Sequence, residues 1–231
     1  MNNKRYNLPT QAARRTGGFT LIEMLMIIGI ILILSSILVP SLIAARRVAK
    51  TAQTRATIHL LDGACQMYMH EMADILSAAA PTSPLYPPSK PGTMNGVTMQ
   101  GRHLLVECLT GYLNKAGDGA EGPGFRLTGG KKLYGPYNGA ENVATVVDST
   151  NNLPVFVDSF GQPILYYCGP TFDTGHNTGT GFPTDATYVN NPATNKPYIN
   201  TFWIISPGPD GEFWDPAVSG MTNDDITNFN R

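Results

Sequence analysis

The most uneven feature of the chain is a block of apolar residues near its N-terminus. Residues 19–45 are almost entirely apolar, whereas residues 1–18 are polar and the chain after residue 80 is rich in Gly, Pro, Asn, Thr and Tyr. About 20 apolar residues are enough for a helix to cross a bilayer. The pattern therefore predicts a membrane-spanning helix followed by a polar, turn-rich domain.

The helical pattern continues beyond the apolar block. Apolar residues recur every three or four positions, at Ala44, Val48, Ala52, Ala56, Ile58, Leu61, Ala64, Cys65, Tyr68, Met72 and Ile75. We therefore expect one helix over residues 19–77, kinked or loosened at Pro40, where a backbone hydrogen bond is missing. The stripe on its second half needs a partner, and a globular head packed against it would supply one.

Residues 78–231 predict a small head of α+β class, because a helical pattern is followed by strand patterns. A short second helix is expected over residues 100–115, with Gly117 just beyond its end. Three strands are expected over residues 153–158, 163–167 and 199–206. The first two flank Ser159-Phe160-Gly161-Gln162, a hairpin signal, and all three would form one antiparallel sheet covering the long helix.

Composition and charge narrow the function classes. A chain of 231 residues suits one modest domain plus one extra element, and a net charge of −1 gives no reason to expect nucleic acid as a partner. The cysteines are Cys65, Cys108 and Cys168, an odd number without C-x-x-C spacing, which argues against a zinc site and a dense disulfide scaffold. A bridge between Cys108 and Cys168 in an oxidising compartment is left open.

The N-terminal segment is not typical of a secretory signal peptide. Such a signal places its small-residue cleavage site after the apolar stretch, whereas Gly17-Gly18 precedes it here. Residues 1–18 carry four basic residues and no acidic one. A plain signal anchor would leave Glu23 unexplained, because a carboxylate in a membrane helix is costly and is usually functional.

The string Gly18-Phe19-Thr20-Leu21-Ile22-Glu23 closely resembles the processing site of type IV pilins and type II secretion pseudopilins. The resemblance covers residues 1–50. It implies a leader of residues 1–18, removed by a prepilin peptidase that cuts after Gly18 and methylates the amine of Phe19. It further implies a pilin-like fold, with the membrane part over residues 19–45, and an assembly role for Glu23 and Pro40.

Electrostatic pairing between subunits would explain why the apolar segment contains the Glu23 carboxylate. Cleavage frees an α-ammonium group at Phe19, and Glu23 of a neighbouring subunit can pair with it. Each charge then lowers the cost of burying the other in an apolar setting. Such a pair would fix the axial register between subunits of a filament.

The C-terminal segment suggests a cation loop. Residues 206–229 combine acidic residues and glycines without regular periodicity, and Ca²⁺ takes about six to eight oxygen ligands in flexible geometry. The EF-hand spacing is missing, so a solvated acidic turn is the alternative. Residues 158–163, 206–211 and 224–229 resemble the Asp-Pro-Trp-Gly-x-Pro segment and the calcium loop of major type II pseudopilins, although Phe160 replaces the Trp.

The resemblance implies a Ca²⁺ site in this loop. The side-chain candidates are Asp210, Asp224 and Asp225, with Glu212 and Asp215 as weaker ones. Pro207 and Pro209, which stiffen the first arm, depart from the family pattern.

A structural subunit rather than an enzyme is the leading expectation. The resemblance implies a major pseudopilin anchored once in the inner membrane, with its head in the periplasm, assembling into a filament for type II protein secretion. Its partners would be other copies of itself, the prepilin peptidase, the inner-membrane assembly platform, other pseudopilins and membrane lipid. The alternative within the family is a major or minor subunit of a type IV pilus that serves adhesion, motility or DNA uptake.

A membrane-anchored periplasmic enzyme is the alternative from another class. His103, His176 and the cysteines lie in no recognisable catalytic motif. We therefore expect no catalytic site.

Overall fold

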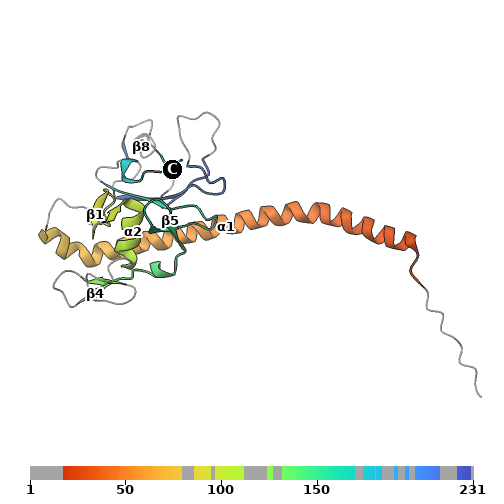
Figure 1. Cartoon of the computed structure of the whole chain (residues 1–231), viewed down its shortest axis with the longest axis horizontal. Coiled ribbons are helices and arrows are strands. Elements are labelled where there is room, and N and C mark those ends of the chain that lie inside the picture. Colours follow the sequence, from red (N-terminus) through yellow and green to blue (C-terminus); the bar gives the residue numbers. More distant parts are fainter. Residues whose placement is uncertain are drawn as a thin grey trace, which may run out of the picture. The chain divides into compact units, whose positions relative to one another are not determined.

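The computed structural model of the protein describes residues 18–79, 86–94, 97–111, 124–126, 132–169, 174–179, 181–183, 190–191, 196–197, 201–213 and 223–229. The chain divides into two compact units, Met1–Arg46 and Arg47–Arg231. Helix α1, Leu21–Ala79, contributes to both units (Figure 1). The long helix expected over residues 19–77 is therefore confirmed, while residues 1–17 of the expected leader lie outside the described residues.

The N-terminal part of α1 is long and apolar enough to cross a membrane. None of residues 18–50 is buried by the rest of the chain, although most of residues 21–45 are large apolar side chains. A helix that is apolar all round normally lies in a membrane or in a protein core. The helix passes through Pro40 without interruption, so this proline does not break it.

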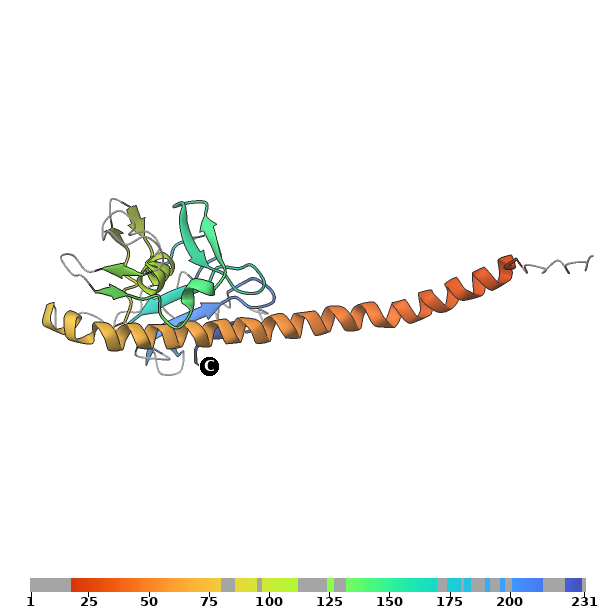
Figure 2. The same cartoon turned by 90° about the horizontal axis from the view of Figure 1, so that it is seen from below.

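The second half of α1 is packed against the head. Its buried residues are Thr54, Ile58, Leu61, Ala64, Cys65, Tyr68 and Met72, which recur every three or four positions. All of them except Thr54 share one core with side chains of α2 (Gly101–Thr110) and of several strands, and Figure 2 shows the head's strands alongside the helix. The packed stripe begins at Thr54, whereas Ala52 and Ala56 of the expected stripe are exposed. The side chain of Ile75 lies outside the described part.

The strands of the head form antiparallel pairs. The largest sheet has the order β11-β10-β7, made of Ile226–Thr227, Phe202–Ser206 and Leu165–Cys168. A second sheet pairs β5, Thr145–Asp148, with β6, Leu153–Phe156. Three smaller ribbons pair β1 with β2, β3 with β4, and β8 with β9. Their bounds are Gly92–Met94, Val97–Met99, Phe125–Arg126, Leu133–Tyr134, Asn190–Asn191 and Lys196–Pro197. Within the described residues, the 3-10 helices η2 and η3 span Ala140–Asn142 and Thr174–His176.

The expected strands exist, but they do not form one sheet. β6 pairs with β5, which sequence analysis did not predict, whereas β7 pairs with β10. The predicted hairpin is present as a short connection: Val157 and Pro163 form an isolated bridge, the Ile164 N–H donates to the Phe156 carbonyl at 2.9 Å, and the Asp158 N–H donates to the Gln162 carbonyl at 2.9 Å. β5 carried no sequence signal because all four of its residues are exposed or half-exposed, so no alternation of polar and apolar positions marks it.

The expectation that the second helix reaches residue 115 is wrong. α2 ends at Thr110, because Gly111 adopts the left-handed conformation (φ +69°) and donates its N–H to the Glu107 carbonyl at 2.8 Å. A left-handed glycine is the commonest way to end a helix. Gly117, which was expected to lie beyond the helix end, is outside the described residues.

The three cysteines are free thiols. The Cys108–Cys168 bridge that sequence analysis left open is therefore not formed. Burial raises the pKa of the Cys65 thiol, that of Cys108 to about 12, and that of Cys168 to about 11. The thiols thus act as apolar core groups.

Candidate functional site

The proposed processing site is accessible. Gly18, Phe19 and Thr20 precede the first turn of α1, and the Phe19 residue is 73% exposed. A side chain built at Gly18 would meet no atom within 4 Å. Among the described residues, nothing covers the Gly18–Phe19 peptide bond and no contact requires a glycine at this position.

Glu23 has a partner within its own chain. The N–H and the hydroxyl of Thr20 both donate to Glu23 Oε2 at 2.8 Å, and the Glu23 N–H faces Thr20 Oγ1 at 3.3 Å. This reciprocal arrangement is a capping box, which satisfies N–H groups at a helix start. Sequence analysis assigned Glu23 only an intermolecular role, although the Thr-x-x-Glu spacing that marks a capping box was present in the sequence.

The two arms of the acidic loop lie side by side. Ser206 pairs with Ile226, and Ile205 with Thr227, in the β10–β11 ladder. Gly208 has φ +72°, and a Cβ there would lie 2.4 Å from the carbonyl oxygen of Asp224. Only a glycine allows this approach without strain, so Gly208 brings the first arm against the backbone of the second.

Asp210 and Asp224 face one another across the two arms. Burial raises the pKa of Asp224, and the adjacent Asp210 carboxyl raises it further by hydrogen bonding and charge repulsion. The Arg47 guanidinium, whose Nη2 lies 3.9 Å from Asp224 Oδ2, acts in the opposite direction and lowers the pKa of Asp224. Asp224 Oδ1 is buried and meets no hydrogen-bond donor among the described residues. Two facing carboxyl groups with an oxygen that lacks a donor form an arrangement that suits a hard cation.

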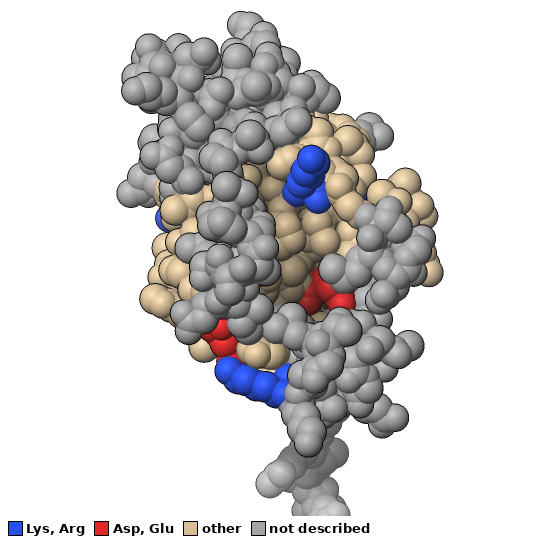
Figure 3. Space-filling view, turned by 90° about the vertical axis from the view of Figure 1, so that its left-hand side faces the viewer, with Lys and Arg blue, Asp and Glu red and all other residues tan. Residues whose placement is uncertain are grey.

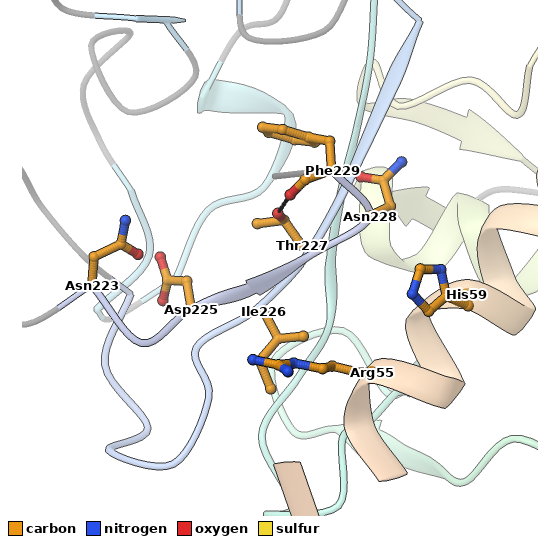
Figure 4. A pocket seen from close by; sticks show the side chains of 8 residues that line it. All are labelled: Arg55, His59, Asn223, Asp225, Ile226, Thr227, Asn228 and Phe229. Atoms are coloured by element: carbon orange, nitrogen blue, oxygen red, sulfur yellow. Dashed lines mark hydrogen bonds between the residues drawn. The ribbon is translucent and has the colours of Figure 1, made fainter. Parts of the chain in front are cut away.

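The other described metal candidates, Asp225 and Glu212, form no group of three with these two. Asp225 lines a neighbouring pocket of about 530 Å³ with Arg55 and His59 from α1 (Figure 4). Among the described residues, no three His, Cys, Asp or Glu side chains lie together in a group that would hold a metal ion. Glu212 is exposed and donates its N–H to Asp210 Oδ1 at 2.9 Å, whereas Asp215 lies outside the described residues.

The histidines named as enzyme candidates are held in structural hydrogen bonds. His103 Nδ1 accepts the N–H of Gln100 at 3.1 Å at the start of α2. His176 Nδ1 lies 2.7 Å from the hydroxyl oxygen of Ser89. Ser89 and His176 are both buried, at 2% and 7% exposure. A serine next to a histidine is the arrangement of a hydrolase nucleophile and base, but this hydroxyl lies inside the packed head.

Figure 3 shows the charged side chains among the described residues on one face of the molecule. Among the described residues drawn there, acidic and basic groups are scattered and neither sign forms a continuous patch. A binding site for a polyanion would instead gather Lys and Arg on one face.

Comparisons with known proteins add no relative: no family model, curated protein or solved structure matches the chain. A functional assignment therefore depends on the residues and the geometry described above.

Proposed function

We propose that this chain is a pilin-like structural subunit, a pseudopilin that assembles into a periplasmic filament for type II protein secretion. One observation carries the proposal. A Gly-Phe-Thr-Leu-Ile-Glu processing string lies at the exposed start of a helix whose first part is apolar and unburied and whose second half is covered by an α+β head. This is the layout that the resemblance to type IV pilins implies.

The exposed apolar helix gives the physical reason for assembly. Its side chains would be costly in water, at about 25 cal/mol per Å² of apolar surface. They lie in lipid before assembly and against the same helix of other subunits afterwards. The inner membrane, the prepilin peptidase, the assembly platform and other pseudopilins are the corresponding partners. The acidic loop favours a role in secretion over a role in a type IV pilus. The subunit of a type IV pilus would have the same long N-terminal helix, so the helix does not distinguish the two.

Ca²⁺ binding by the acidic loop is part of the proposal. Asp210 and Asp224 supply facing carboxyl groups, one with a buried oxygen that lacks a donor, so the residues present fit a cation. Backbone carbonyls of the two arms would supply further oxygen ligands, and Asp225, which lines the neighbouring pocket, stays the third side-chain candidate. The ion would neutralise the repulsion between the two arms and close the loop.

The capping box allows a sharp test of Glu23. Glu23→Gln keeps an N3 side chain that can cap the helix but removes the charge that would pair with the amine of Phe19. We expect this variant to insert and to be cut normally. Filament yield should fall by more than about tenfold, because leaving one member of a buried ion pair unpaired costs roughly 3–5 kcal/mol. Filaments are sheared, pelleted and quantified after co-expression with the peptidase and assembly platform.

Thr20→Val is the matched control. It removes the hydroxyl that bonds Glu23 Oε2 but leaves the carboxylate charged. Loss of an N-cap costs about 1 kcal/mol of helix stability, so assembly should stay near wild type. Equal yields from Glu23→Gln and wild type would show that the carboxylate only caps the helix.

A further inference from the structure

A buried polar hub fixes the first arm of the acidic loop. Asp158 is 5% exposed and Ser206 is fully buried. The Ser206 hydroxyl donates to Asp158 Oδ2 at 2.6 Å, and its oxygen accepts the N–H of Gly208 at 3.1 Å. Ser206 therefore connects Asp158 to Gly208, the glycine that lies against Asp224.

The other oxygen of Asp158 holds a different segment. Asp158 Oδ1 accepts the N–H groups of Phe160 and Gln162 at 2.8 and 2.9 Å, which shapes the turn of residues 158–162. The Ser159 N–H of the same turn donates to Thr54 Oγ1 of α1 at 3.2 Å. One carboxylate thus joins the acidic loop to a turn that lies on the long helix.

A single face of α1 receives both segments. Arg47, Lys50 and Thr54 are three and four residues apart, the spacing of neighbours on one helix face. Arg47 Nη2 lies 3.9 Å from Asp224 Oδ2, and Lys50 Nζ lies 5.5 Å from the ring centroid of Phe160. The second loop arm and the turn therefore both contact the stripe of α1 that leads into the core.

An ordinary turn does not account for this hub. An Asp that caps its own turn explains the two bonds to Oδ1. It does not explain why Oδ2 reaches a buried serine 48 residues away, or why the serine in turn holds the N–H of Gly208. A buried carboxylate is costly unless hydrogen bonds compensate it, so a simple strand connection would be made more cheaply by apolar side chains.

We propose that Asp158 and Ser206 are positioning residues of the calcium loop and that they couple cation binding at Asp210 and Asp224 to the docking of the 158–162 turn on α1. The inference rests on the proposed cation binding by this loop. Binding orders Asp224 and with it Gly208. Through the hydrogen bond between Ser206 and Asp158, the ordering extends to the N–H groups of Phe160 and Gln162, which are not proposed ligands.

Hydrogen exchange of the full chain in detergent micelles tests the coupling, with Ca²⁺ itself as the probe. In wild type, calcium should slow exchange in the loop arms and also at the turn amides of Phe160 and Gln162. We expect roughly tenfold slower exchange at the turn, within the usual range of coupling between sites.

Two variants separate coupling from simple stability. Ser206→Ala should retain calcium protection in the arms, with several-fold weaker calcium affinity, while the turn no longer responds. Ser89→Ala is the matched control, because Ser89 is also buried, contacts His176 through its hydroxyl and accepts the N–H of Cys168. It should keep the calcium response of the turn. If Ser206→Ala does not fold, Asp158→Asn keeps an Oδ1 acceptor for the two turn amides, but it removes the carboxylate charge and replaces the acceptor of the Ser206 hydroxyl by an NH2 donor.

The outcomes are distinguishable. Calcium protection of the arms without any response of the wild-type turn overturns the coupling and leaves cation binding standing. A turn that still responds in Ser206→Ala and Asp158→Asn also overturns it. No calcium effect anywhere in wild type removes both the cation site and the coupling, but it leaves the filament proposal to the Glu23 experiment.

Discussion

Arg102 and His103, which are buried at the start of α2, form a polar cluster with the half-buried Asp148. Arg102 Nη2 lies 2.6 Å from Asp148 Oδ2, and His103 Nε2 lies 3.1 Å from the same oxygen. Burial lowers the pKa of His103 and the Arg102 charge lowers it further, against the opposing effect of Asp148. Burial alone would raise the pKa of Asp148, but the bonds from Arg102 and the Thr150 N–H outweigh it and lower that pKa to about 2.

The cluster makes the stability of the head depend on pH. The pKa of His103 is lower in the folded state, so the unfolded chain takes up the proton first as pH falls. Stability is therefore fully present above the unfolded pKa of about 6.5 and is lost as pH falls toward the folded pKa. We expect the melting temperature to drop between pH 7.5 and 5.5 in wild type and to change less in His103→Gln. His59→Gln, on the exposed face of α1, should behave as wild type. An equal drop in melting temperature in wild type, His103→Gln and His59→Gln would contradict the assignment of this pH dependence to His103.

At the scale of elements, Gly111 is the residue on which the end of α2 depends. A Cβ at this position would lie 2.1 Å from the carbonyl oxygen of Gly124, in addition to the strain of φ +69°. We expect Gly111→Ala to lower the free energy of unfolding by more than about 2 kcal/mol, since left-handed backbone alone costs about 1–2 kcal/mol in a residue with a Cβ. Denaturant unfolding of the full chain measures this.

Gly161→Ala is the matched control for that substitution. Gly161 also has positive φ, +86°, but a Cβ there would meet no atom within 4 Å. It should show only the cost of the backbone conformation. If Gly111→Ala lowers the free energy of unfolding by no more than Gly161→Ala does, the contact with Gly124 does not restrict the helix end.

The acidic loop should be stabilised by Ca²⁺. Binding to the folded state alone contributes about 2.7 kcal/mol at 100-fold excess over Kd, which corresponds to a rise of roughly 5–10 °C in melting temperature for a chain of this size. Asp224→Asn should abolish most of this rise and should not destabilise the chelated protein, because it also removes the repulsion with Asp210. Glu212→Gln, on the exposed side of the loop, should keep the rise. Identical melting curves of wild type in calcium and in chelator would exclude the site.

The parts that could be read from the sequence were those with a strong local pattern. α1 was predicted because its apolar block and stripe are long, and β10 because Phe202–Ser206 is continuously apolar up to Ser206. β5 was missed because an exposed strand has no alternation to detect. The link between Asp158 and Ser206 joins residues far apart in the chain, so only the folded structure brings it to light.

At the scale of the whole molecule, one helix serves two environments. Residues 18–50 bury no side chain within the chain, whereas the second half of α1 contributes six apolar residues to the head's core: Ile58, Leu61, Ala64, Cys65, Tyr68 and Met72. The head buries the apolar side chains of the second half of the helix. The N-terminal part is long and apolar enough to cross a membrane, and its unburied apolar side chains are the physical basis of the proposed filament.

Removal of the leader tests the central claim most directly. Co-expressed with a prepilin peptidase, the chain should lose residues 1–18 and begin with N-methyl-Phe19, as measured by intact mass. Gly18→Leu should block the cut through its effect on the peptidase, because a Cβ at Gly18 meets none of the described atoms within 4 Å. A mature mass that starts at Phe19 with one added methyl group is the predicted result. An uncut wild-type chain, or one cut at another bond, would contradict the account.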